Sequence, residues 1–195
     1  MDADGLSSYT FACATSAEER LARRLGLPTV RVGVRAANGV PDARLVSFGL
    51  AGALHDGLGV GDVLDATRVV DEHGRTLREG GPLGVAGARP ATVLGAAELV
   101  HDPAERRRLH EKSGADAVDM ESGVLARSGR LAGVVRVVSD GIESAIEGVD
   151  HTVHADGRTD VVGLLRWIAT RRGDAVRSMR DAVSALQALE RAVAA

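Results

Sequence analysis

Short apolar segments that favour β-strands alternate along this chain with segments that favour helices, and this alternation limits the folds open to it. Strand-like segments occupy residues 9–14, 29–36, 44–50, 90–97, 115–120 and 133–140. Helix-favouring segments occupy 16–26, 103–114, about 121–130 and the stretch from 174 onward. One bent strand or two strands are expected within 62–77, turning at His73 and Gly74. This rhythm predicts an α/β fold, a three-layer αβα sandwich with a central mixed sheet.

Capping signals mark several of the expected helices. Ser16 can cap the first helix, with Glu18 in its first turn, and Gly26 would end it. Pro103 suits a first-turn position and Gly114 a stop. The last segment should lie as an amphipathic helix on the sheet, because its apolar residues recur at helical spacing: Val176, Met179, Val183, Leu186, Leu189 and Val193.

The composition indicates an ordinary globular chain. It has 195 residues, 45% of them hydrophobic, and neither an internal repeat nor a Pro/Gly/Ser-rich linker divides it. We therefore expect residues 1–195 to form a single domain. The chain begins with acidic residues and has no apolar run near the roughly 20 residues of a membrane-spanning helix, so we expect a cytoplasmic protein without membrane insertion.

Charge and aromatic content argue against nucleic acid as a partner. The net charge is −3, and only 2% of the residues are aromatic, too few for a platform of stacked bases. The basic run Arg106, Arg107 and Arg108 is interpreted as a solvated helix face. Cys13 is the only cysteine, which excludes an internal disulfide and a multi-cysteine metal site, and no metal is expected.

The segment FGLAGAL follows the strand expected at 44–49 and is rich in small residues. It could form a cradle in which backbone amides approach a sugar or an anion, or simply a tight turn. It has neither the spacing of a dinucleotide-binding loop nor the lysine of a phosphate-binding loop, so neither of those sites is expected.

Two other expected strands end in carboxylates. In VDMES, Glu121 could accept hydrogen bonds from vicinal hydroxyls beside Met120, or it could favour the start of the following helix. In RVVSD, Asp140 could act as a general acid in a shielded pocket, or it could cap a helix. Ligands of α/β folds gather at the carboxyl ends of strands, so these segments are candidates for one site.

Taken in order, SFGLAGAL, GVGDVLDA, AVDMES and VRVVSD resemble the nucleoside phosphorylase and nucleosidase superfamily, whose members cleave the N-glycosidic bond of nucleosides. The resemblance covers most of the chain. It is closest to the hopanoid-associated phosphorylase branch, through AVDMES, the VRVVSD segment and the C-terminal tail. The 5′-methylthioadenosine/S-adenosylhomocysteine nucleosidases are the next nearest. A phosphorylase/hydrolase-like fold is implied.

The resemblance also implies roles for particular residues. Asp140 and Glu18 would be catalytic, the first at N7 of a departing purine and the second on the attacking water. Glu121 would hold the ribose hydroxyls and Met120 would pack against the sugar. The other implied substrate-binding positions are Ser139, which supports Asp140, Ala51 and Gly52 on the ribose side, and the backbone near Leu99 facing the base.

Three departures from the family pattern bear on these roles. The places where phosphorylases hold phosphate read Ser47 and Leu50, which favours hydrolysis, although Arg20 or another residue could still hold the anion. No aromatic residue stands near Glu98 to stack on the base. The stretch from residue 39 to 44 is too short for the helix expected there, and this gap, with the family's habit of oligomerising, favours a homodimer.

The expected activity is therefore release of a purine base from an adenosine-type nucleoside that carries an unidentified substituent at its 5′ position. Hydrolysis and phosphorolysis both remain open, and no cofactor is expected unless phosphate serves as co-substrate. The methylthioadenosine/adenosylhomocysteine reaction itself is one alternative. A nucleoside-binding protein of the same fold without catalysis is the other.

Overall fold

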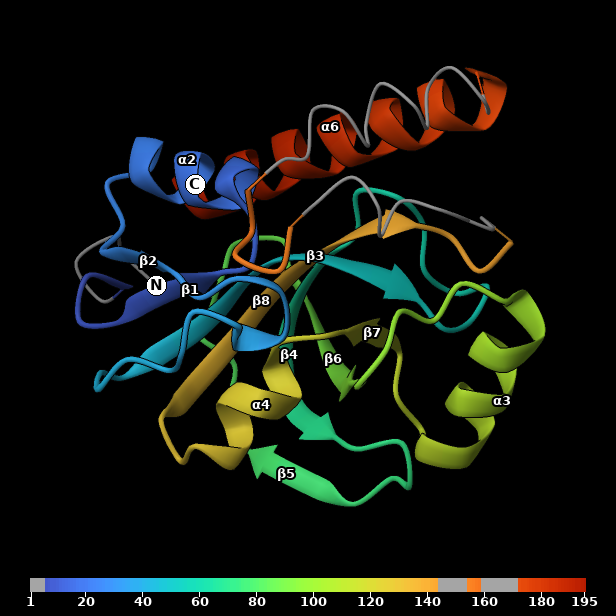
Figure 1. The fold of residues 1–195 in the computed structure, drawn as a ribbon, viewed down its shortest axis with the longest axis horizontal. Coiled ribbons are helices and arrows are strands. Elements are labelled where there is room, and N and C mark those ends of the chain that lie inside the picture. Colours follow the sequence, from blue (N-terminus) through green and yellow to red (C-terminus); the bar gives the residue numbers. More distant parts are fainter. Residues whose placement is uncertain (1–5, 144–153, 159–171) are drawn as a thin grey trace.

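The computed structural model describes residues 6–143, 154–158 and 172–195 (Figure 1). Its described residues form a mixed eight-stranded sheet with helices packed against it, which confirms the expected α/β fold. The strands are β1 Thr10–Cys13, β2 Thr29–Arg31, β3 Leu45–Ala53, β4 Val63–Val70, β5 Thr76–Glu79, β6 Arg89–Gly95, β7 Ala117–Asp119 and β8 Leu131–Asp140.

The order of the strands brings distant segments together. Along the sheet it is β2-β1-β3-β7-β6-β4-β5, and β8 pairs with both β3 and β4. Strands β3, β7, β6, β4 and β8 therefore close into a ring. Strand β3 runs parallel to β8 and antiparallel to β7, so the ends of β7 and β8 meet the same part of β3.

Helices lie on both sides of this sheet. Helices α2 (Ser16–Arg24) and α6 (Arg172–Ala194) are on one side, and α4 (Ser122–Arg127) is on the other (Figure 1). Helix α3 (Pro103–Ser113) follows β6, and a short 3-10 helix, η1, spans Val34–Ala36. None of the helices among the described residues has the length and apolar character needed to span a bilayer.

One hydrophobic core cluster lies between the sheet and helices α2 and α6, and another includes Leu125 and Ala126 of α4. Phe11 of β1 and Phe48 of β3 pack edge to face with their ring centroids 5.5 Å apart, and both are fully buried. Cys13 is buried in the same cluster. Helix α6 covers this cluster with Ala185 and Leu189, so the expected packing of the C-terminal helix on the sheet is confirmed for this part of it.

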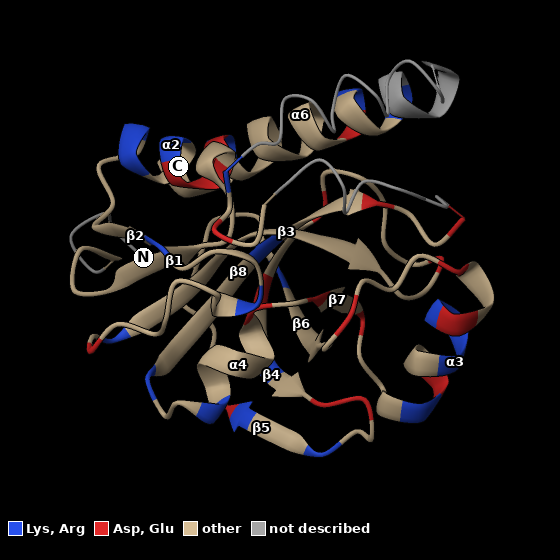
Figure 2. Ribbon diagram, in the orientation of Figure 1, with Lys and Arg blue, Asp and Glu red and all other residues tan. Residues whose placement is uncertain are grey.

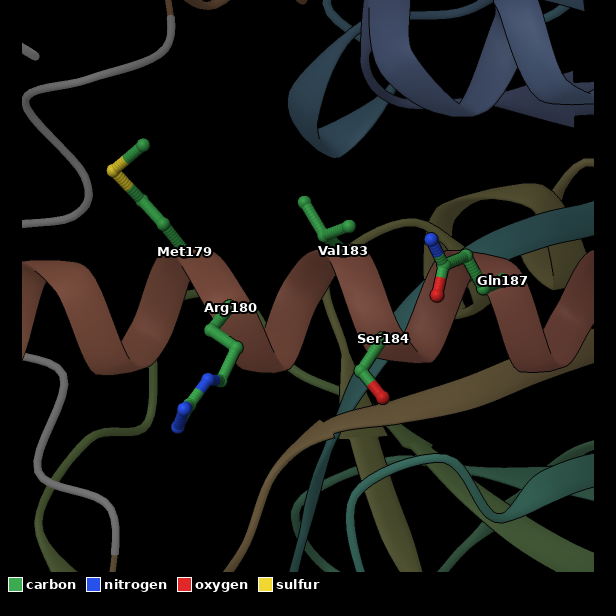
Figure 3. A pocket seen from close by; sticks show the side chains of 5 residues that line it. All are labelled: Met179, Arg180, Val183, Ser184 and Gln187. Carbon is green, nitrogen blue, oxygen red and sulfur yellow. The ribbon is translucent and has the colours of Figure 1, made fainter.

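The amphipathic face of α6 is not buried along its whole length. Met179 is 42% exposed and Val183 is 55% exposed, and both project from the same side of the helix (Figure 3). They line a shallow groove of about 530 Å³ together with Arg180, Ser184 and Gln187. The expectation that Met179 and Val183 contact the sheet was wrong. The side chain of Val176 lies outside the described residues.

Three local predictions also need correction. Thr15, not Ser16, caps α2, because its hydroxyl accepts the N–H of Glu18 at 3.3 Å. The strand expected over 29–36 ends at Arg31, because Arg35 and Ala36 adopt left-handed backbone conformations. The small residues of FGLAGAL lie within β3 and not in a turn after it. The two-strand alternative for 62–77 is confirmed by β4 and β5.

Candidate active site

Both carboxylate oxygens of Glu18 accept hydrogen bonds, one from β3 and the other from the residue that caps α2. Oε1 accepts the N–H of Leu50 at 2.9 Å, and Oε2 accepts the backbone N–H and the hydroxyl of Thr15 at 2.8 and 3.0 Å. The capping box that starts α2 thus also aims Glu18 at the sheet. The residue is only 3% exposed, so its carboxylate is fixed in a buried position.

Arg136 lies at the centre of a buried group of charges. Its Nη2 atom is 2.5 Å from Oδ2 of Asp119, 3.3 Å from Oε2 of Glu121 and 2.6 Å from Oγ of Ser47. Its Nη1 atom donates to the carbonyl of Leu50 at 3.2 Å. Figure 2 shows that the central strands β3 and β8 are mostly uncharged along their length. Glu18, Asp119, Glu121 and Arg136 are called the carboxylate cluster below.

Gly49 makes room for this cluster inside β3. A Cβ atom at this position would overlap Oε1 of Glu18 and would lie 2.9 Å from Nη1 of Arg136. Its φ of +150° also favours glycine. The cradle expected from FGLAGAL is therefore a place where buried side chains approach the backbone of the strand.

Glu121 is a buried carboxyl group with an unusual environment. Burial raises its pKa to about 7; Arg136 opposes this shift, while Asp119 and Glu18 add to it. Its Oε1 atom accepts the N–H of Arg35 at 3.1 Å, from the η1 turn. Close to neutral pH this carboxyl group is therefore poised between its acid and its carboxylate forms.

Glu121 stands at the N-cap position of α4, where a carboxylate can favour the start of the helix, as the alternative expected. Its side chain makes no capping hydrogen bond to α4. Asp119 does so instead, because its Oδ1 atom accepts the N–H of Ser122 at 3.0 Å. The Ser122 hydroxyl also donates to Asp119, and it lies 3.1 Å from the hydroxyl of Ser47. The Glu121 side chain is thus left to contact Arg136 and Arg35.

Asp140 belongs to a second polar group, at the end of β8. Its Oδ2 atom is 2.5 Å from Nη2 of Arg106, and its Oδ1 atom accepts the hydroxyl of Ser139 at 2.7 Å. The same hydroxyl lies 3.3 Å from the carbonyl of Ala51. A Cβ atom at Gly52 would come within 2.9 Å of Oδ2 of Asp140, so glycine at this position leaves room for the ion pair of Asp140 and Arg106. Asp140, Ser139 and Arg106 are called the Asp140 group.

Arg106 contradicts the interpretation of the basic run as a solvated face. Its side chain is 2% exposed, whereas those of Arg107 and Arg108 are 44% and 58% exposed. Arg107 pairs with Glu143 and Arg108 with Glu105, as surface arginines do. Helix α3 therefore buries the first arginine of the run and exposes the other two.

The two polar groups are connected through a three-residue stretch of β3. Leu50 contacts Glu18 and Arg136 of the carboxylate cluster. Ala51 contacts Ser139 and Gly52 lies beside Asp140, in the Asp140 group. The structure thus brings Glu18 and Glu121 together, and it places Ser139, Asp140, Ala51 and Gly52 at the next part of the same strand.

Met120 and Leu99, two of the expected site residues, belong to neither polar group. Met120 is half-buried between β7 and α4. Leu99 is 37% exposed, one residue before Val100, whose carbonyl accepts Nε of Arg106 at 3.0 Å. A groove of about 310 Å³ is lined by Arg35, whose backbone N–H contacts Glu121, and by residues that include Glu72, His73, Ala96, Ala97 and Arg127, but by no residue of either polar group. The larger groove on α6 contains none of the residues of either polar group.

Sequence reasoning missed Arg136 and Arg106. A signal for Arg136 was present, because it is the one charged residue within the apolar run GVVRVVS, where arginine is buried only with partners. No comparable signal existed for Arg106, because its neighbours Arg107 and Arg108 are of the same type. Arg35 was also missed, since only its backbone N–H contacts Glu121.

Comparison with solved structures shows which fold this is. A 5′-methylthioadenosine/S-adenosylhomocysteine nucleosidase from Campylobacter jejuni superposes with a TM-score of 0.54 at 15% identity, covering 95% of this chain and 99% of that one. Futalosine hydrolase from Helicobacter pylori gives 0.54 at 13% identity, covering 93% and 99%.

A mutant methylthioadenosine nucleosidase from Helicobacter pylori, with 5′-methylthioadenosine in its active site, gives a TM-score of 0.53 at 14% identity, covering 91% of this chain and 98% of that one. No family model and no curated protein matches the sequence. At these identities the likeness shows the fold alone, which this chain shares with these nucleosidases and the futalosine hydrolase.

Proposed function

We propose that this protein cleaves the N-glycosidic bond of a purine nucleoside, of the adenosine type and modified at the 5′ position, and releases the free base. The observation that carries the proposal is the arrangement on β3. Residues 50–52 have the carboxylate cluster at one end and the Asp140 group at the other, in the fold of the nucleosidases. Both groups are mostly buried, as a site that excludes water requires.

The chemistry of this bond matches the residues. Its cleavage develops oxocarbenium character on the sugar and negative charge on the purine. In the proposed arrangement Glu121 accepts hydrogen bonds from the ribose hydroxyls, and Met120 packs against the sugar. Asp140, supported by Ser139, faces N7 of the base. Ala51 and Gly52 line the ribose side, and the backbone near Leu99 faces the base.

Water is the acceptor that the cluster favours. The buried carboxyl groups of Asp119 and Glu121 contact the single guanidinium of Arg136, and the buried Glu18 contacts Leu50 beside it. A phosphate dianion brought beside them would be repelled, because charges at short range interact strongly where water is excluded. A neutral water meets no such repulsion, and Glu18 can orient and deprotonate it. We therefore propose hydrolysis.

The test is to incubate the protein with adenosine, 5′-methylthioadenosine and an adenosine carrying a 5′ alkyl chain, each with and without phosphate. Free base and sugar product are then measured. We expect free base and the unphosphorylated sugar, in amounts that phosphate does not change. Ribose 1-phosphate as product would overturn the hydrolytic proposal, and absence of base from every nucleoside would overturn the enzymatic one.

A nucleoside-binding protein without catalysis is the second candidate. It is favoured by the contacts of Asp140, because both of its oxygens already accept a hydrogen bond within the protein. Calorimetry that detects binding of an adenosine analogue without release of base would support this candidate, and measurable turnover would exclude it.

The homodimer also stays a prediction. It is motivated by the short connection from residue 39 to 44, which leaves one side of the sheet without the helix expected there. Light scattering at micromolar concentration tests it, and the mass of a single chain would contradict it.

A further inference from the structure

Arg106 of α3 ties together two chain segments at Asp140. Its Nη2 atom holds Oδ2 of Asp140, its Nη1 atom donates to the carbonyl of Gly141 at 3.0 Å, and its Nε atom donates to the carbonyl of Val100 at 3.0 Å. Each of the three nitrogen atoms of the guanidinium therefore has a defined partner. The end of β8 and the loop between β6 and α3 are fixed relative to each other by one side chain.

These contacts limit the orientations open to Asp140. A planar guanidinium holds an acceptor in a fixed direction, and the hydroxyl of Ser139 holds the second oxygen. Because the Arg106 side chain is 2% exposed, it makes these contacts away from solvent. A Cβ atom at Gly52 would lie 3.2 Å from Nη2 of Arg106, so glycine at this position leaves space for the ion pair of Arg106 and Asp140.

We propose that Arg106 is a positioning residue for Asp140. It fixes the carboxylate in the orientation in which Asp140 contacts the base, and it acts through Asp140 and not by touching the substrate. This inference rests on the proposed function. Arg106 is the one residue of α3 in the two polar groups, so this role connects α3 to the site.

A double-mutant cycle tests the proposal, because a residue that acts only through Asp140 has no effect once Asp140 is replaced. The variants are R106K, D140N and R106K/D140N, with R108K on the same helix as the matched control. Lysine keeps the charge beside Asp140 but cannot make all three contacts. The readouts are kcat for base release and binding of free adenine by calorimetry, with thermal melting to confirm folding.

We expect R106K to lower kcat on the order of 10²-fold, as a displaced catalytic group does, and to weaken adenine binding. In the D140N background, R106K should change kcat and adenine binding by less than about 2-fold each. This is within the usual deviation from additivity for independent sites. R108K should behave as wild type. An equal loss in both backgrounds, or no loss in either, overturns the proposal.

Two further outcomes separate this inference from the proposed function. A wild-type protein that neither releases nor binds a base overturns both, whereas turnover that R106K leaves unchanged overturns only the role of Arg106. If R106K does not fold, R106M/D140N, which removes both charges of the pair, is compared with D140N alone. A difference in adenine binding between these two overturns the proposal, and equal binding supports it.

Discussion

The guanidinium of Arg136 lies 2.5 Å from the carboxylate of Asp119, and both side chains are 1% exposed. Arg136 also contacts Glu121, so one buried cation serves more than one buried carboxyl group. Burial alone would lower the pKa of Arg136, but Asp119, Glu121 and Glu18 together raise it. Removing Arg136 would therefore leave the buried carboxyl groups of the carboxylate cluster without the cation that they contact.

Replacing Arg136 with methionine should destabilise the protein by about 3–5 kcal/mol, because carboxyl groups would remain buried without their cation. Urea unfolding monitored by circular dichroism measures the change. R127M is the control, since Arg127 is exposed near the end of α4. A loss below about 1 kcal/mol for R136M would show that the cluster does not need its cation.

Gly49→Ala should destabilise the fold by about 1–3 kcal/mol, the usual range for overpacking. The added methyl group would overlap Oε1 of Glu18 and crowd Arg136, so the strand or the cluster must shift. G81A is the matched control, because a Cβ at Gly81 meets nothing within 4 Å. Equal stability of the two variants in thermal unfolding would contradict the close packing at Gly49.

The pH dependence of stability should report on Glu121. Its folded pKa is raised from 4.5 to about 7, so between these values the folded protein binds a proton that the unfolded chain has lost. The contribution of Glu121 to stability is thus fully present below about pH 4.5 and is lost as the pH rises towards 7. The slope in that window is at most about 1.4 kcal/mol per pH unit.

Glu121→Gln should remove this contribution, because glutamine stays neutral at every pH. The difference in unfolding free energy between E121Q and wild type should therefore shift in favour of the variant as the pH rises from 4.5 to 7. Urea unfolding at several pH values measures it. A difference that does not change with pH would mean that Glu121 titrates normally in the folded protein.

Asp140→Asn should lower kcat for base release by about 10²–10⁴-fold, the usual contribution of a general acid or base. Asparagine has the same shape but cannot carry the proton or the charge. D42N is the matched control, because Asp42 is 94% exposed and pairs with Arg130 at the surface. Turnover of D140N within a few-fold of wild type would remove Asp140 from the mechanism.

Local sequence signals predicted much of the fold. Helix α3 starts at Pro103 and stops at Gly114, which adopts the left-handed conformation with φ of 67°, as expected. The strands preceding Glu121 and Asp140 were also predicted, because apolar runs and their ends are visible within a few residues. Where a long-range contact set the local structure the prediction was wrong, as at Arg35, whose left-handed backbone donates to Glu121, 86 residues away.

The sequence by itself determined the order of strands and helices and the carboxylates that end β7 and β8, since propensity, capping and periodicity act between near neighbours. Only the tertiary structure decided which charges are buried together. Arg136 meets Ser47 across 89 residues, and Arg106 meets Asp140 across 34. Such pairings follow from the parallel register of β3 with β8 and from the packing of α3, which neighbouring residues do not encode.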